Sequence, residues 1–435
     1  MSKLLNDNSR CNVKGLFSVS PMLFFILLFI FIFLLTGNIY KISLSVVFTI
    51  SSVYALYTLK NRSITERIKV FSRGAGQENL MLMLWIFVLA GAFAQTAKDI
   101  GGIDAVVRVA LHFLPSHLIL AGLFVTACFV SLSIGTSVGT VAALVPIATG
   151  IATSTGQPTA MLVAAVVGGA FFGDNLSFIS DTTIASTKTQ GCELKDKFKA
   201  NFLIVLPAAI ITVIIYIFTN SQSQYSTEIT AIDYIKMLPY IIILVSAICG
   251  MNVFVVLAVG NLLSGITGMA LGVCNMEDWF VSAGNGIMSM GELIIISMLA
   301  GGMLEVIREN GGIEYIINKL SSHIHSKRGG ELIIGAMVGI TNLCTANNTI
   351  AILSVGKIAK SISTRFGINP CKAASILDTF SCVVQGLIPY GAQFLIASGL
   401  SHVQPTNILP YIYYPVIVGI TAIIGIIIRY PKKYS

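Results

Sequence analysis

Charged side chains are scarce in this 435-residue chain: Asp, Glu, Lys and Arg make up only 11% of it, whereas 55% of its residues are hydrophobic. A water-soluble fold of this length needs more polar surface, so the soluble classes are excluded. Apolar stretches of about 18 to 22 residues recur along the chain, and each can cross about 30 Å of hydrocarbon as a helix. We therefore expect an all-α polytopic membrane protein.

Metal-binding spacings of cysteine and histidine are also missing. The eight cysteines form no CxxC pair, and the five histidines fall at expected membrane edges or in loops. This pattern excludes a zinc or other transition-metal centre and favours reduced, structural thiols. We expect a carrier with no cofactor, rather than an enzyme.

The positive net charge of +8 comes from basic residues in a few short loops, as topology signals do, and predicts no nucleic-acid partner. Loops 60–73 and 188–199 are rich in Lys and Arg and are placed inside, whereas 220–233 and 274–285 lack them and are placed outside. The first apolar run has no small-residue cleavage site and is interpreted as a retained helix. Both termini are expected to be cytoplasmic, in the cytoplasmic membrane.

The second half resembles the first at an offset of about 210 residues, with Gly101-Gly102-Ile103-Asp104 matching Gly311-Gly312-Ile313-Glu314. Thr136 and Thr140 pair with Thr345 and Thr349 at nearly the same offset. We expect one repeat at 1–219, an external linker at 220–234 and a second repeat at 235–435. Five crossings in each half give two repeats of opposite orientation, as in many secondary transporters.

Loop charge also predicts re-entrant hairpins. If 331–363 crossed the membrane once, the basic residues on its two sides would lie on opposite faces, against the charge rule. We therefore expect hairpins at 331–363 and 117–152, and broken helices at 159–187 and 373–400. The expected fold has about ten transmembrane helices, two re-entrant hairpins and two inverted-topology repeats.

The central feature of this expected fold is the segment Gly173-Asp174-Asn-Leu-Ser-Phe-Ile-Ser-Asp181-Thr-Thr183. Asp174 and Asp181 are the only charged residues in 118–187. A carboxylate at membrane depth costs several kcal/mol unless it is paired, hydrated or neutralised, and such residues mark proton or cation paths. The alternative is helix capping by Asp and Ser.

Hydroxyl, amide and carboxylate oxygens suit hard cations. Asp174 and Asp181 are the expected Na⁺ ligands, and Asp378 is a candidate second proton site. Neutral ligands are expected among nearby polar residues, for which helix packing is the alternative: Asn175, Ser177, Ser180, Thr182, Thr136, Ser137, Thr345, Asn347, Asn348 and Gln385. Glu292 is a weaker candidate near a helix start.

The segment 173–183 resembles the signature of the NhaC family of sodium/proton antiporters, and the run from Leu377-Asp378-Thr-Phe to Gln385-Gly-Leu-Ile-Pro-Tyr-Gly391 is similar to its later signature. The likeness covers roughly 80–428. It implies exchange of Na⁺ for H⁺ and a place in the ion-transporter superfamily, whose members pair re-entrant hairpins with broken helices. Asn175 and Phe178 stand where many members have Lys and Pro.

Three functions stay open from the sequence. The first is exchange of Na⁺, Li⁺ or K⁺ for H⁺ by alternating access, with small inorganic ions and the bilayer as partners and a homodimer as an open alternative. The second is a cation-coupled carrier of an organic anion or amino acid, which would need helix N-termini because the motif helices hold no Lys or Arg. The third is an intramembrane aspartyl protease, against which Phe171 stands at a position that needs Gly.

Overall fold

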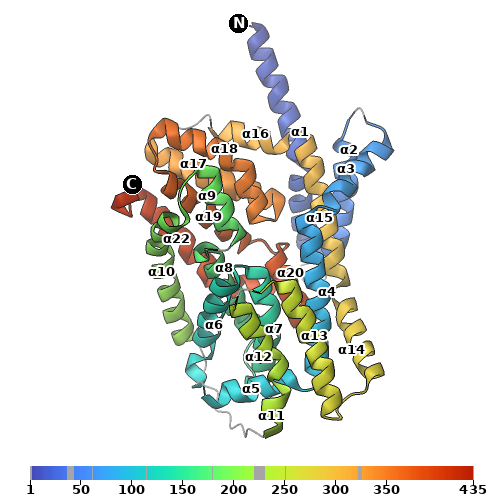
Figure 1. Ribbon diagram of the computed structural model, residues 1–435. Coiled ribbons are helices and arrows are strands. Elements are labelled where there is room, and N and C mark those ends of the chain that lie inside the picture. Colours follow the sequence, from blue (N-terminus) through green and yellow to red (C-terminus); the bar gives the residue numbers. More distant parts are fainter. Residues whose placement is uncertain are drawn as a thin grey trace.

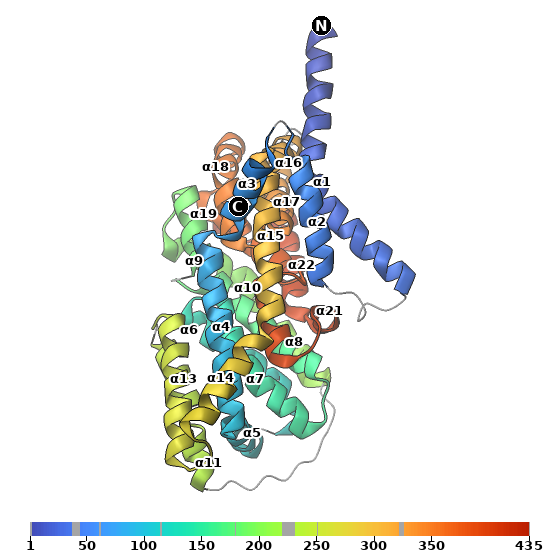
Figure 2. The ribbon, with the colours of Figure 1, turned by 90° about the vertical axis from the view of Figure 1, so that its right-hand side faces the viewer.

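A computed structural model describes residues 2–36, 44–60, 62–113, 115–178, 180–219, 231–249, 251–321 and 326–434, and these ranges are helical with short connections. Figures 1 and 2 show an elongated bundle in which α16 to α18 lie at one end and α5 and α11 at the other. Most of the expected external linker, residues 220–230, lies outside the described ranges.

The first half contains eleven elements up to Thr219. They are α1 (Ser2–Thr36), α2 (Leu44–Thr58), α3 (Ile64–Ala75), α4 (Glu78–Asp99), α5 (Gly102–Phe113), η2 (Ser116–Leu118), α6 (Ile119–Ile134), α7 (Ser137–Thr155), α8 (Thr159–Leu176), α9 (Asp181–Gln190) and α10 (Leu194–Thr219).

The second half begins at Ala231. It contains α11 (Ala231–Lys236), α12 (Leu238–Ile248), α13 (Val253–Ala270), α14 (Met276–Ser289), α15 (Gly291–Glu309), α16 (Gly312–Ser321), α17 (Lys327–Thr345), α18 (Asn348–Phe366), α19 (Pro370–Gln385), α20 (Ala392–Ser401), α21 (Pro405–Ile408), η3 (Leu409–Tyr411), α22 (Tyr413–Ile427) and η4 (Lys432–Tyr434).

Helix starts in the two halves are related by one constant offset, here called the repeat offset. The same separation along the chain relates the first residues of α7 and α18, of α8 and α19, and of α9 and α20. The left-handed residues Gly156 and Gly367, which end α7 and α18, keep it too. By this measure Thr136 corresponds to Asn347, because each is the N-cap of its helix. The sequence-based pairing of Thr136 with Thr345 was therefore out of register.

Several helices lie where loops or single helices were expected. The basic loop 60–73 contains α3, an amphipathic helix whose start is fixed by a capping box between Ser63 and Glu66. The expected external loop 274–285 forms most of α14. It was interpreted as a loop because it contains acidic but no basic residues. Gly286, in the same helix, allows close packing: a Cβ there would lie 2.2 Å from the carbonyl oxygen of Gly91 on α4.

Within the described residues, six helices are long and apolar enough to span a membrane, or seven if the pair Pro405–Tyr411 and Tyr413–Ile427, bent by 54°, counts as one span. About ten were expected. Several apolar helices fall short because they have only 15 or 16 residues, as α2 and α6 do. At 1.5 Å per residue such a helix measures about 22 to 24 Å, less than the hydrocarbon thickness.

Helix α8 forms the centre of the bundle, and almost all of its side chains are buried. It packs closely on α6 because Gly169 has no side chain: a Cβ there would lie 2.5 Å from the carbonyl oxygen of Phe124. The Ser131 hydroxyl on α6 then donates to the carbonyl oxygen of Ala170 at 2.6 Å. This contact fixes the helix whose last turn contains Asp174.

Candidate functional site

A cavity of about 360 Å³ lies where four interrupted helices meet. Most of its polar lining comes from the turn between α6 and α7, the break between α8 and α9, the turn between α17 and α18, and the break between α19 and α20, and Asn252 at the start of α13 adds to it. The polar lining residues are Thr136, Ser137, Asp174, Ser180, Asp181, Thr182, Asn252, Asn347, Asn348, Thr349, Gln385 and Gln393. Two carboxylates are the only charged side chains among the described residues that line it.

Asp174 occupies the last turn of α8 and is 4% exposed. Its Oδ1 accepts a hydrogen bond of 2.9 Å from the Ser137 backbone N–H, and its Oδ2 accepts one from the Ser137 hydroxyl. Thr136, the N-cap of α7, makes no capping bond with its own side chain. The carboxylate therefore caps a neighbouring helix at its positive end, where the dipole favours a negative charge.

A chain of amides extends this contact across the cavity. The Gln393 Nε2 donates to the Ser137 hydroxyl oxygen at 2.8 Å, and the Gln385 Nε2 donates to the Gln393 Oε1 at 3.0 Å. The Gln385 Nε2 also donates to the carbonyl oxygen of Ala346 at 3.0 Å. Hydrogen bonds thus connect Asp174 in the first half to the α17–α18 turn in the second.

Gln385 also presents an open acceptor. Its Oε1 is buried and has no hydrogen-bond partner among the described residues. A buried carbonyl oxygen without a partner is costly, and a bound cation at this position would compensate it.

The break after α8 leaves carbonyl groups that the next segment satisfies. The carbonyl oxygen of Asp174 accepts from the Thr182 hydroxyl at 3.0 Å. The Ser180 and Thr182 hydroxyls are 2.9 Å apart, and both residues are buried. Asp181, the first residue of α9, is instead exposed on the cavity side. Its side chain is therefore open to the cavity, whereas that of Asp174 is enclosed by protein.

Ser177 and Asn175 are buried but are not among the residues that line the cavity. Ser177 is the C-cap of α8, and its backbone N–H donates to the Gly173 carbonyl oxygen at 2.7 Å. The Asn175 Nδ2 donates to the Phe171 carbonyl oxygen at 3.0 Å. Both side chains therefore have a structural place at the end of α8.

In the α17–α18 turn, Asn347 caps α18 by accepting from the Ile350 backbone N–H at 3.0 Å. The Thr345 hydroxyl donates to the Asn347 carbonyl oxygen at 3.0 Å, and Thr345 does not line the cavity. Asn348 lines it and is 3.9 Å from the Cys382 sulfur. The site is chemically asymmetric, because the repeat offset places Gln385 opposite Asp174 and Ala392 opposite Asp181.

Asp378 lies behind this cavity on α19 and is completely buried. Its Oδ2 accepts from the ammonium group of Lys197, which is 1% exposed. Lys197 was interpreted from the sequence as a cytoplasmic loop residue, and this was wrong. A buried lysine needs a counter-charge, and Asp378 supplies it.

Lys197 also completes the end of α8. Its Nζ donates to the carbonyl oxygen of Asn175 at 2.9 Å and to the Thr183 hydroxyl at 2.7 Å. Asn201, one turn later on α10, donates to the same carbonyl oxygen at 2.7 Å and to the Asp378 Oδ2 at 3.2 Å. The spacing of four residues between Lys197 and Asn201 places both on one helix face, and this was the signal in the sequence.

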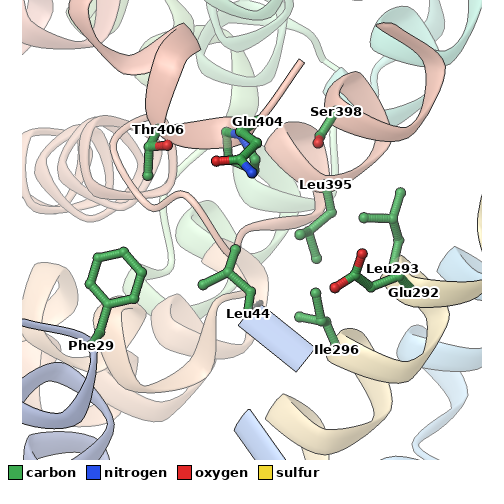
Figure 3. A pocket seen from close by; sticks show the side chains of 10 residues that line it. Phe29, Leu44, Glu292, Leu293, Ile296, Leu395, Ser398, Gln404 and Thr406 are labelled. Carbon is green, nitrogen blue, oxygen red and sulfur yellow. The ribbon is translucent and has the colours of Figure 1, made fainter. Parts of the chain in front are cut away.

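Glu292 belongs to a different cavity of about 90 Å³, shown in Figure 3. Its carboxylate accepts from the Ser45 hydroxyl at 3.0 Å, and Leu293, Ile296 and Leu395 surround it. The structure therefore does not bring Glu292 to the site of Asp174.

These features define a class: a helical membrane carrier whose interrupted helices enclose an acidic cavity of hard oxygen ligands. A sequence model of the Na⁺/H⁺ antiporter family matches residues 12–221 and 223–428, two segments that begin one repeat offset apart. The chain belongs to this family. It is a multi-pass membrane protein and a cation/proton antiporter by family membership.

Individual proteins are similar to this chain. The chain is 25% identical over 398 residues to the Na⁺/H⁺ antiporter NhaC of Bacillus subtilis (strain 168), covering 82% of this chain and 85% of the relative. It is 18% identical to a malate-2H⁺/Na⁺-lactate antiporter of the same organism, covering 80% and 82%. Among solved structures, the Alcanivorax borkumensis YdaH transporter aligns with a TM-score of 0.44 at 11% identity, covering 90% and 99%.

Proposed function

We propose that the protein exchanges Na⁺, or Li⁺ or K⁺, for H⁺ at the cavity that contains Asp174. One observation carries this proposal: two carboxylates and a set of neutral oxygens line the cavity, and no Lys, Arg or His among the described residues does. Such a lining attracts a cation and offers no positively charged side chain to an organic anion.

Competition at Asp174 couples the two ions. With a proton bound, the carboxyl group is neutral and remains hydrogen-bonded to Ser137. An incoming cation displaces that proton, because one desolvated carboxylate holds either a proton or a metal ion. Asp181, exposed at the cavity wall, draws the cation in, and the unpartnered oxygen of Gln385 is a neutral ligand for it. The remaining neutral ligands are Thr136, Ser137, Ser180, Thr182, Asn347 and Asn348.

Lys197 and Asp378 keep the chain non-helical between α8 and α9. Their ion pair holds the Asn175 carbonyl oxygen, so the chain cannot continue as a helix past Leu176. Asp378 is the second proton site in this scheme, and it becomes available only when Lys197 moves away from it.

Alternating access uses two repeats of opposite orientation, with about ten spans and the α6–α7 and α17–α18 pairs as re-entrant hairpins. The constant offset between helix starts in the two halves supports this proposal. So does Figure 1, in which the α17–α18 pair approaches the site from one end of the molecule and the α6–α7 pair from the other. Both termini and the α17–α18 ends then lie in the cytoplasm.

The alternative is cation-coupled exchange of an organic anion or amino acid. It is favoured by the name of one relative, a malate-2H⁺/Na⁺-lactate antiporter. Among the described residues, Lys197 is the one buried lysine beside the site, and its ammonium group is already held by Asp378. An organic carboxylate would therefore depend on the N-termini of α7 and α18.

The experiment is dequenching of a pH-sensitive dye in everted vesicles. Na⁺, Li⁺, K⁺ and organic acids are added in turn to wild type, Asp174→Asn and Asp181→Asn. We expect proton movement with a bare cation and an inert anion, none with Asp174→Asn, and reduced cation affinity with Asp181→Asn. Proton movement only with an organic acid would contradict the proposal and support the alternative.

A further inference from the structure

A second cavity, of about 480 Å³, lies at the end of the molecule where α17, α18 and α19 meet the C-terminal segment. Its lining combines Lys327 at the start of α17, Lys360 near the end of α18 and Lys433 in η4. These segments gather in one region at the upper left of Figure 1. No carboxylate is among the described residues that line this cavity.

The three ammonium groups carry charge without an acidic partner. Among the described residues, none of them forms an ion pair with a carboxylate. Lys360 Nζ lies beside the end of α9, 3.3 Å from the position a Cβ at Gly191 would take. Lys433 Nζ lies 5.5 Å from the ring centre of Tyr434. The one nearby buried carboxylate, Glu331, has Lys372, Arg429 and Arg328 within electrostatic range in addition to Lys327, so it does not balance the cluster.

Two buried polar atoms in the lining also lack a hydrogen-bond partner among the described residues. They are the Tyr434 hydroxyl and the Gln190 Oε1, on side chains that are 6% and 2% exposed. Buried polar atoms are nearly always satisfied. The Tyr434 hydroxyl is a donor, so an acceptor group in this cavity would complete it, whereas the Gln190 Oε1 is itself an acceptor and requires a donor. Lysines that serve only as topology signals need neither a cavity nor buried polar atoms without partners. Lys357 and Arg365, on α18 with Lys360, are expected on the same side of the membrane, and neither lines this cavity.

The C-terminal segment is held in place over the cavity. The ammonium group of Lys372, on α19, donates to the carbonyl oxygen of Tyr430. This contact positions Lys433 and Tyr434 beside α17 and α18. The N-terminus of α19 is already capped, because Asn369 accepts from the Cys371 N–H at 2.8 Å, so side chains must hold the ligand.

We propose that this cavity binds the phosphate group of an anionic phospholipid from the cytoplasmic leaflet. The ammonium groups and the phenolic hydroxyl can donate to the two unesterified oxygens of a phosphate diester, and the lysines attract its single negative charge. Basic pockets at the cytoplasmic ends of membrane helices face anionic lipid headgroups, whereas free phosphate is dilute by comparison. The proposal rests on the cytoplasmic orientation given under the proposed function. Lipid binding is measured without transport, so the lipid-binding proposal and the proposed ion exchange can fail separately.

The test uses the full chain in phosphatidylcholine nanodiscs, with and without phosphatidylglycerol, and quantifies co-purified lipid. Wild type is compared with Lys360→Gln/Lys433→Gln and with the matched control Lys357→Gln/Arg365→Gln, which removes the same charge from the same end. We expect the cavity variant to retain phosphatidylglycerol about tenfold less than wild type, and the control to resemble wild type. Equal loss in both variants, or no preference of wild type for phosphatidylglycerol, would overturn the proposal.

Two further measurements complete this experiment. Inorganic phosphate is titrated against the thermal unfolding of wild type in phosphatidylcholine alone. Stabilisation as large as that given by phosphatidylglycerol would overturn the lipid source. Tyr434→Phe removes only the unpartnered hydroxyl, so it should fold normally and weaken retention of phosphatidylglycerol. This variant decides the question if the double variant does not fold, and unchanged retention would overturn the role of the hydroxyl in the site.

Discussion

At the residue scale, the cavity depends on two differently balanced buried charges. Asp174 accepts hydrogen bonds from the N-terminal turn of α7, whereas Asp378 forms an ion pair with Lys197. Only the first of these carboxylates lines the cavity. We propose from this difference that Asp174 is the first site of exchange and that the Lys197–Asp378 ion pair supports the fold until Lys197 moves away.

Removal of one partner of the ion pair should destabilise the fold more than removal of both. Lys197→Met leaves Asp378 as an uncompensated buried carboxylate, and we expect a loss of about 3–5 kcal/mol in unfolding free energy. The double variant Lys197→Met/Asp378→Leu should recover most of it, because an apolar pair replaces two desolvated charges. Thermal unfolding in detergent measures both, with Lys199→Met as control. A double variant less stable than either single variant would contradict this assignment.

The sequence identified most of the residues around the cavity but not their contacts. Polar residues inside apolar sequence were conspicuous, and Asp174, Asp181, Asn347, Asn348 and Gln385 do line one cavity. Their role in ion binding stays a prediction. Lys197 and Gln393 were missed for different reasons. A lysine next to a basic loop is indistinguishable from a topology signal, and a glutamine in a helix shows its partner only in three dimensions.

At the scale of elements, the site depends on how closely α8 approaches α6. The approach is set by Gly169, where any side chain would meet backbone atoms of Phe124 and Cys128. Apolar stretches in the sequence indicated α6 and α8, but α3 and most of α14 were interpreted as loops because of their charged residues. Charged residues occur in amphipathic helices at a membrane edge as well as in loops, so charge alone does not distinguish the two.

We therefore expect Gly169→Ala to lower both the stability of the fold and the ion affinity to an unusual degree for a glycine-to-alanine change. The added methyl group lies 2.5 Å from the Phe124 carbonyl oxygen, so we expect α6 and α8 to separate at a cost of about 1–3 kcal/mol, and ion affinity to fall as Asp174 shifts. The matched control is Gly284→Ala in α14, where nothing lies within 4 Å and alanine should be neutral or stabilising. Equal effects of the two changes on thermal unfolding would refute the packing argument.

At the scale of the whole molecule, the recurrence of helix bounds at the repeat offset describes two similar halves. The offset of about 210 residues inferred from the sequence agrees with the separation of these helix starts, because glycines and polar turns repeat even where side chains differ. The division into two inverted repeats stays a prediction. The sequence did not predict how the lining of the cavity is divided: both of its carboxylates come from the first half, and its amide side chains come from the second.

Cysteine accessibility tests the hairpins. In a cysteine-free background, Ser326→Cys and Thr364→Cys lie at the two ends of the α17–α18 pair, and both side chains are exposed. We expect an impermeant maleimide to label both only in everted vesicles, and to label the external control Glu277→Cys only in intact cells. Labelling of Ser326→Cys and Thr364→Cys from opposite sides would show that the pair spans the membrane.

The most direct test of the central claim is uptake of radioactive sodium into proteoliposomes with an acidic interior, comparing wild type with Asp174→Asn. The asparagine oxygen can still accept from the Ser137 backbone N–H, so the fold should persist while the exchangeable charge is lost. We predict uptake that depends on the pH gradient in wild type and falls to the level of empty liposomes in the variant. Undiminished, gradient-dependent uptake by Asp174→Asn would show that exchange occurs elsewhere in the protein.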